Sequence, residues 1–253
     1  MNWDKPDRNF VIMGMARSGT SLACKLVSEQ VRNSYCLNDA EINFNKVPAL
    51  LAETRRCLVN REPVTNRFRG DELSSDTVRV LAPLEPRVAT GDFNSNAAVG
   101  VKMIPEYRKA IAAGYLVIAM LRDPVYAIAS WGSHDIAWAH VTDDDMDPIW
   151  RYRGIKFKMS SQVERQCEIW EFFAKQILEA KASGKVQVDV WKYEGLVALP
   201  DLHIRDFASY FGLAAKRGVR LANLNDPSRF YGIRTIRDAV AELCPSRLEF
   251  GYA

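Results

Sequence analysis

The stretch Phe10-Val-Ile-Met-Gly-Met-Ala-Arg-Ser-Gly-Thr-Ser21 decides the fold, because an apolar run passes directly into a loop of small residues. Four apolar residues in a row, at 10–13, are typical of a strand that is buried on both faces. Two glycines bound a tight loop over 14–19, and residues 20–30 carry apolar side chains at helical spacing. The sequence therefore predicts a strand, a loop and a helix in direct succession.

Further strand-like and helix-like segments alternate along the chain. Buried strands are predicted over 99–104, 115–121 and 186–191, and helices over 162–181 and 202–211. Because such alternation produces a parallel sheet with helices on both faces, we expect an α/β fold, a three-layer sandwich with a central parallel sheet and a P-loop-like first strand-loop-helix unit. Ligands of these sheets bind beyond the carboxyl ends of the strands, where the first loop falls.

Three stretches have no clear helical or strand pattern. Residues 55–86 are rich in charge and proline and are interpreted as a surface excursion or a helical cover. Residues 131–160 combine aromatic side chains with three successive aspartates and are interpreted as a lid or acceptor-binding segment. The last segment, 229–253, is interpreted as wrapping back over the core. We expect one domain over 1–253, since this length is near the upper limit for a single core.

The composition excludes several classes of protein. Hydrophobic residues make up 48% and charged residues 26% of the chain, which is ordinary for a soluble globular protein. The net charge of +3 comes from dispersed residues, so we expect no nucleic-acid partner, and the first apolar run is too short for a signal peptide or a membrane span. Five cysteines lie far apart without a CxxC pair, which predicts reduced cytoplasmic thiols and neither a zinc site nor disulfides: Cys24, Cys36, Cys57, Cys167 and Cys244.

The loop over 14–19 has the composition of an anion site. Its backbone N–H groups and the N-terminus of the next helix can surround a phosphate or a sulfate. Thr20 and Ser21 add hydroxyl donors, and Arg17 adds a permanent positive charge. Nucleotide-hydrolysing P-loops have lysine where this chain has Thr20, and similar loops also occur as plain connectors. The loop by itself therefore predicts only a phosphate cradle.

A second candidate anion site follows the strand predicted over 115–121. Arg122 stands at the strand end, and Ser130 lies about two helical turns further on, so both could reach one phosphate. The alternative is that Asp123-Pro124 only begins a helix and that Arg122 pairs with a neighbour. Two anion sites at the ends of two strands predict a nucleotide that is phosphorylated on its 5′ and 3′ sides, which a simple ATP-dependent enzyme does not need.

These motifs resemble those of the sulfotransferases that use 3′-phosphoadenosine 5′-phosphosulfate (PAPS). Arg17-Ser-Gly-Thr-Ser21 is similar to the 5′-phosphosulfate loop of that family, and Arg122-Asp-Pro with Ser130 is similar to its 3′-phosphate motif, at the same interval of eight residues. The family's Tyr-Glu-x-Leu segment is also similar to a later stretch of this chain, Val190-Trp-Lys-Tyr-Glu-Gly-Leu. The resemblance implies PAPS binding by Arg17, Ser18, Gly19, Thr20, Ser21, Arg122 and Ser130, with Tyr193 either near the nucleotide or in the core. Adenosine 3′,5′-bisphosphate (PAP) would be the product.

The same resemblance implies the groups that transfer the sulfuryl group. Arg17 would stabilise charge on the leaving phosphate, and Lys102 in Lys102-Met-Ile-Pro would stabilise the sulfuryl oxygens. Glu41 in Glu41-Ile-Asn-Phe resembles the base of carbohydrate-type members and is the candidate general base. Glu106 and His134 are its competitors. No metal is expected.

The acceptor is the least constrained partner. The implied activity is transfer to a hydroxyl of a carbohydrate or a small molecule, and four aromatic side chains are candidates to stack against it: Trp131, Trp138, Trp150 and Tyr152. A P-loop kinase that uses ATP and a non-catalytic anion-binding protein of the same fold stay open as alternatives. The sequence does not indicate an oligomeric state.

Overall fold

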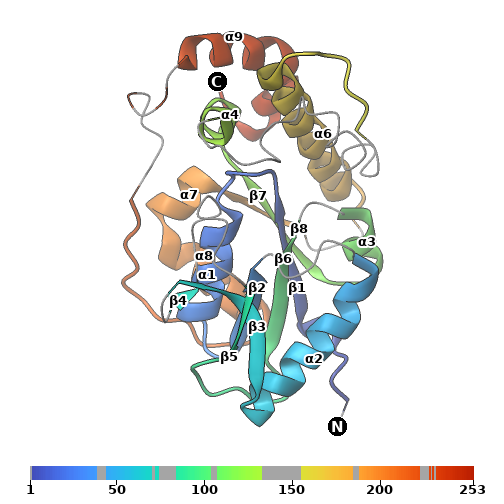
Figure 1. Ribbon diagram of the computed structural model, residues 1–253, viewed down its shortest axis with the longest axis vertical. Coiled ribbons are helices and arrows are strands. Elements are labelled where there is room, and N and C mark those ends of the chain that lie inside the picture. The colour runs from blue at the N-terminus through green and yellow to red at the C-terminus, as the bar shows by residue number, and fades with distance from the viewer. Residues whose placement is uncertain are drawn as a thin grey trace.

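A five-stranded parallel sheet forms the centre of the protein, and its strand order is β2-β6-β1-β7-β8 (Figure 1). The computed structural model describes residues 2–38, 44–69, 72–73, 84–103, 107–132, 155–184, 188–222, 228, 230 and 232–253. The strands of this sheet are β1 (Asn9–Gly14), β2 (Ser34–Asn38), β6 (Ala98–Met103), β7 (Leu116–Leu121) and β8 (Val188–Lys192). Since β1 lies between β6 and β7, the carboxyl ends of these three strands share one edge.

The buried strands are the ones that the apolar runs predict. All residues of β1, β6 and β7 are buried, as expected of parallel strands with helices on both faces. Side chains alternate between the faces, so that Phe10 and Ile12 belong to one apolar core and Val11 and Met13 to the other. The sequence does not predict β2, because Ser-Tyr-Cys-Leu-Asn is polar at both ends.

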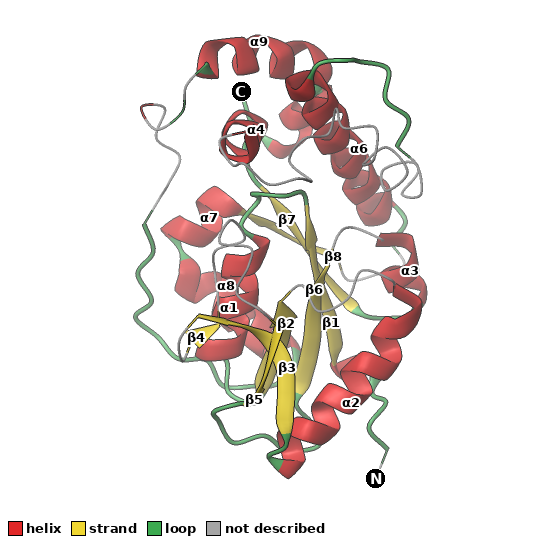
Figure 2. Cartoon of the chain, in the orientation of Figure 1, coloured by secondary structure: helices red, strands yellow, loops and turns green. Residues whose placement is uncertain are grey.

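Helices cover both faces of the sheet (Figure 2), which confirms the three-layer α/β sandwich. One layer consists of α1 (Thr20–Gln30), α7 (Tyr193–Ala198) and α8 (Pro200–Tyr210). The opposite layer consists of α2 (Val47–Asn60), α3 (Tyr107–Ala112), α4 (Pro124–Gly132), α6 (Gln162–Ala182) and α9 (Ile233–Leu243). Short 3₁₀ turns are η1 (Pro6–Arg8), η2 (Phe44–Lys46) and η5 (Pro245–Phe250). The helices predicted over 162–181 and 202–211 therefore exist, with shifted ends.

Residues 55–86 are only in part the helical cover that the sequence suggests. α2 packs its buried Leu51 and Leu58 into the core, but an antiparallel ribbon of order β4-β3-β5 follows it. Its strands are β3 (Pro63–Arg69), β4 (Glu72–Leu73) and β5 (Leu84–Val88). The buried Asn66 amide of β3 binds the Asn38 N–H (2.7 Å) and the Cys36 carbonyl (3.2 Å) of edge strand β2. The ribbon thereby covers this edge of the sheet.

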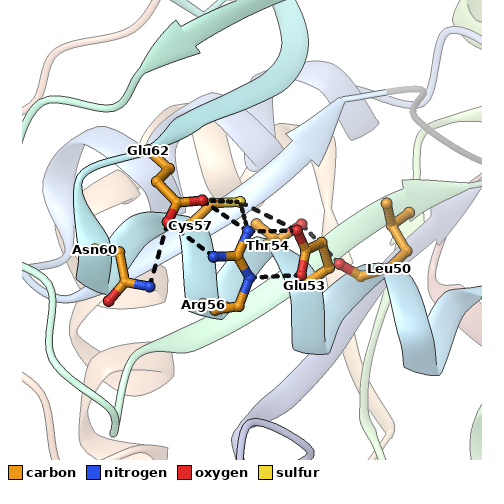
Figure 3. A network of polar contacts seen from close by, with 7 residues as sticks. All are labelled: Leu50, Glu53, Thr54, Arg56, Cys57, Asn60 and Glu62. Carbon is orange, nitrogen blue, oxygen red and sulfur yellow. Dashed lines mark hydrogen bonds and ion pairs between the residues drawn. The ribbon is translucent and has the colours of Figure 1, made fainter.

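A polar cluster joins the end of α2 to the start of the ribbon (Figure 3). Arg56 lies 2.7 Å from a carboxylate oxygen of Glu53 and 2.7 Å from one of Glu62. Hydrogen bonds from this guanidinium lower the pKa of both carboxyl groups. The three charged side chains are between 33% and 58% exposed, so solvent screens their charges and their ion pairs contribute little to stability.

The C-terminal segment wraps back over the core, as the sequence suggests. α9 packs against α6, and its buried Ile236 and Val240 join the same apolar cluster as Trp170. All five cysteines are buried and unbridged. Among the described residues, no helix has the length and apolar character that a membrane span requires. In the same part of the chain, no group of three or more His, Cys, Asp or Glu side chains is placed to hold a metal ion.

Candidate functional site

The loop between β1 and α1 is a tight turn that opens onto the N-terminus of α1. The Ser18 N–H and Oγ both bind the Met15 carbonyl, at 3.2 and 2.8 Å. Arg17 has a φ of +68°, which is uncommon for a residue other than glycine. Backbone strain of this kind is concentrated at ligand sites, where the surroundings hold it in place. The turn is therefore held together by its own hydrogen bonds at the start of α1, and its use as an anion cradle stays a prediction.

Two glycines of this loop are required by close approaches. A side chain at Gly14 would place Cβ 2.7 Å from the Met120 carbonyl oxygen on β7. Gly19 has a φ of +91°, and a Cβ there would lie 2.8 Å from Cδ2 of Tyr193. The loop is thus pressed against β7 on one side and against the first residue of α7 on the other.

Lys102 reaches the same loop from the neighbouring strand. It is the fifth residue of β6 and pairs in register with Ile12 of β1. Its side chain is only 5% exposed, and its Nζ donates to Ser21 Oγ at 2.8 Å. The structure therefore brings the candidate sulfuryl-binding lysine to the first turn of α1, although the two residues lie 81 positions apart.

The second motif lies directly against the first. Arg122 follows β7, and its Nη1 donates to the Arg17 carbonyl at 3.1 Å. The Arg17 Nε in turn donates to Ser130 Oγ on α4 at 3.0 Å. The Arg122 guanidinium also stacks on the Tyr193 ring, with its carbon 4.5 Å from the ring centre. The two candidate anion sites are therefore contiguous and lie at the carboxyl ends of neighbouring strands.

The structure agrees with the simpler alternative for this motif, because Asp123 and Pro124 begin α4 and Arg122 contacts neighbouring groups of the protein. The Asp123 carboxylate accepts the Val125 N–H at 2.9 Å, as a cap at the start of α4. Burial raises the pKa of the Asp123 carboxyl group, and the nearby Glu194 raises it further. Tyr193 is buried, at only 5% exposed, and contacts Arg122, while its place near the nucleotide stays a prediction.

Three further residues hold the second motif. The Trp170 indole N–H donates to the Arg122 carbonyl at 3.1 Å, and the Asp123 N–H donates to Glu194 Oε1 at 3.1 Å. The Tyr252 hydroxyl donates to Glu194 Oε2, also at 3.1 Å. These residues lie in segments that resemble sulfotransferases, but no local pattern indicates that they converge on Arg122. Sequence reasoning therefore missed their place in the site.

Several predicted residues fall outside the part of the chain that the structure describes. These are Glu41, Glu106 and His134, the three candidates for the general base, and the aromatic residues Trp138, Trp150 and Tyr152. The assignment of the base stays a prediction. Trp131 is described and is completely buried in the core at the end of α4. Its expected role of stacking against an acceptor is therefore wrong.

Gly19→Ala tests how closely the loop depends on its contact with Tyr193. We expect this variant to lose more stability than Gly212→Ala, which has a similar positive φ of +63° but no atom within 4 Å of the added Cβ. Each alanine would carry the left-handed backbone cost of about 1–2 kcal/mol, and only Gly19→Ala adds the clash with the ring. Thermal unfolding of both variants measures the difference. Equal losses would show that the ring moves aside freely.

Comparisons with known proteins find similar solved structures, among them two sulfotransferase structures. No protein-family model matches the chain, and no curated protein matches it. A sulfotransferase from Alicyclobacillus acidocaldarius is similar at 17% identity and a TM-score of 0.43, with 93% of each chain covered. The sulfotransferase domain of the Synechococcus PCC 7002 olefin synthase is similar at 12% identity and a TM-score of 0.38, with 94% of this chain and 87% of that chain covered.

Proposed function

We propose that the protein is a sulfotransferase that moves a sulfuryl group from PAPS to a hydroxyl of an acceptor. The contact of Arg17 with both Arg122 and Ser130 carries this proposal, because it joins a phosphate cradle to a second cationic site. A nucleotide with anionic groups on its 5′ and 3′ sides needs two such sites side by side. ATP, which has phosphates on one side only, does not.

The donor groups of the site suit an anionic nucleotide. The predicted binding residues offer guanidinium, ammonium, hydroxyl and backbone N–H groups, which are the groups that hold phosphate and sulfate: Arg17, Ser18, Thr20, Ser21, Lys102, Arg122 and Ser130. The α1 N-terminus adds the positive end of its helix dipole. In this proposal the loop binds the 5′-phosphosulfate, and Arg122 with Ser130 binds the 3′-phosphate.

The reaction assigns a separate task to each group. PAPS supplies an activated S–O bond whose leaving group is the 5′-phosphate of PAP. The acceptor oxygen forms a new bond to sulfur while that S–O bond breaks, and the general base, for which Glu41 is our candidate, takes the hydroxyl proton. Lys102 and Arg17 stabilise the negative charge that moves towards the departing phosphate. We further propose a carbohydrate or small-molecule acceptor and a cytoplasmic location, which buried unbridged thiols favour.

Arg122→Ala tests whether the protein binds the nucleotide through its 3′-phosphate as well as through its 5′ side. We expect wild-type protein to bind PAP more tightly than ATP with Mg²⁺, and Arg122→Ala to weaken PAP binding about 10- to 150-fold, the loss of a charged hydrogen bond worth about 1.5–3 kcal/mol. Isothermal titration calorimetry measures these affinities. The control is Arg205→Ala, which removes an arginine whose side chain is 65% exposed on α8.

Two results would count against this proposal. A preference for ATP with Mg²⁺ that Arg122→Ala leaves unchanged would favour the kinase alternative. Tight PAP binding without transfer of ³⁵S from labelled PAPS to any acceptor hydroxyl in a broad panel would favour a non-catalytic binding protein. A sulfotransferase should instead transfer label and release PAP in equal amounts.

A further inference from the structure

We infer that Trp170, Glu194 and Tyr252 are positioning residues that aim Arg122 at the 3′-phosphate of the nucleotide. The inference rests on the proposed function and adds to it the residues that orient Arg122. These residues lie on α6, on α7 and next to the C-terminus, so they reach the site from three separate parts of the chain.

The peptide unit between Arg122 and Asp123 is held on both of its polar atoms. Its carbonyl oxygen accepts the Trp170 indole N–H, and its N–H donates to Glu194 Oε1, each at 3.1 Å. β7 ends at Leu121 and α4 begins at Pro124, so this peptide unit lies between the strand and the helix. Buried backbone groups in such a junction need partners, and here side chains supply them. The direction in which the Arg122 side chain leaves the backbone is therefore set by residues 48 and 71 positions away.

Glu194 is itself held in place. The Tyr252 hydroxyl donates to Glu194 Oε2 at 3.1 Å, and the Tyr252 ring meets the Trp170 ring edge to face, with 6.5 Å between their centres. Burial, followed by the negative charge of Glu194, raises the pKa of the Tyr252 hydroxyl, so it stays a donor at neutral pH. The three side chains thus form one connected unit behind the peptide.

The same first turn of α7 also contacts the Arg122 side chain. Tyr193 precedes Glu194, and its ring lies 4.5 Å from the guanidinium carbon. A short segment therefore holds Arg122 at two points, its backbone through Glu194 and its guanidinium through Tyr193. An arginine side chain that is held in one direction loses less conformational entropy when it binds an anion.

The Glu194 carboxylate lies next to the candidate site for the 3′-phosphate, because it binds the N–H of Asp123, the residue after Arg122. Its negative charge disfavours a nearby phosphate unless donors offset it. The Asp123 N–H and the Tyr252 hydroxyl each bind one of the two oxygens of Glu194. We therefore expect loss of the Tyr252 hydroxyl, which binds Glu194 Oε2, to weaken phosphate binding.

The experiment compares PAP with adenosine 5′-phosphate, which lacks only the 3′-phosphate. Titration calorimetry gives the ratio of the two affinities for wild type, Glu194→Ala, Glu194→Gln and Tyr252→Phe. We expect Glu194→Ala to lower the ratio about tenfold, which corresponds to the loss of one hydrogen bond to a charged group, and Tyr252→Phe to lower it about threefold. Glu194→Gln keeps an oxygen for the Asp123 N–H and should restore most of the ratio. Tyr210→Phe, at an exposed tyrosine, is the control.

The outcomes separate this inference from the proposed function. Suppose that the wild-type protein prefers PAP, but the variants keep the wild-type ratio or lose affinity for both nucleotides equally. Glu194 and Tyr252 are then only structural and the inference is wrong. If the wild-type protein shows no preference for PAP, the proposed function and the inference both fall. Should Glu194→Ala not fold, Tyr252→Phe and Glu194→Gln decide the question, because each removes or exchanges a single polar group.

Discussion

Lys102→Met is expected to lower the rate of sulfuryl transfer at saturating PAPS about 100- to 1000-fold, the usual effect of removing one preorganised donor from a developing negative charge. The Lys102 ammonium group is buried and lies 2.8 Å from Ser21 Oγ at the first turn of α1. In the proposed reaction it faces oxygens whose charge increases in the transition state. Methionine keeps an unbranched side chain of similar length, so the packing of β6 should survive.

The assay for Lys102→Met needs a binding measurement beside the rate. We expect the affinity for PAP to change by less than about threefold, because a group that acts mainly in the transition state changes kcat more than ground-state binding. Lys181→Met, at an exposed lysine near the end of α6, is the control. An unchanged kcat for Lys102→Met, or an equal loss for the control, would contradict the assigned role.

Arg55→Met is expected to destabilise the protein by about 3–5 kcal/mol, because it leaves several acceptors without a donor, at about 1–3 kcal/mol for each one that is buried. Arg55 is completely buried on α2, where its guanidinium donates to Asn9 Oδ1 (2.6 Å) and to the Ala97 carbonyl (3.2 Å), and also to the carbonyls of Trp3 and Arg8. Burial lowers the pKa of this guanidinium. Methionine would leave these acceptors without a donor.

Urea unfolding monitored by circular dichroism measures the effect of Arg55→Met. For a chain of this length, a loss of that size corresponds to a melting temperature lower by roughly 6–20 °C. Arg56→Met is the matched control, because the next residue makes its ion pairs with Glu53 and Glu62 in the solvent-exposed cluster of Figure 3. Equal losses of stability for the two variants would show that the buried hydrogen bonds of Arg55 stabilise the fold no more than the ion pairs of Arg56 do.

The contrast between Arg55 and Arg56 shows where sequence reasoning stops. Both arginines lie in the charged stretch that suggests a surface excursion, yet Arg55 is completely buried whereas the Arg56 side chain is 33% exposed. Their neighbours in the sequence are alike, so no local pattern separates them. The difference arises because α2 turns Arg55 towards the N-terminal segment and the start of β6, which supply its acceptors.

The sequence by itself determined the elements that depend on local chemistry. An unbroken apolar run followed by glycine and hydroxyl residues can hardly form anything but a buried strand, a tight loop and a helix start. The same reasoning predicted β6, β7, β8 and α6 and identified Arg17, Arg122 and Ser130 as candidate anion-binding residues, whereas only the resemblance to sulfotransferases pointed to Lys102. It did not predict β2, because this strand begins and ends with polar residues. It also assigned Trp131 to acceptor binding, whereas this side chain is buried in the core.

Only the tertiary structure decided which of these residues meet. Arg17 reaches Ser130 across 113 positions because β1 pairs with β7, and Lys102 reaches Ser21 because β1 also pairs with β6. Strand order depends on how whole layers pack, and no periodicity within one segment encodes it. The same holds for the convergence of Trp170, Glu194 and Tyr252 behind Arg122, which long-range packing produces.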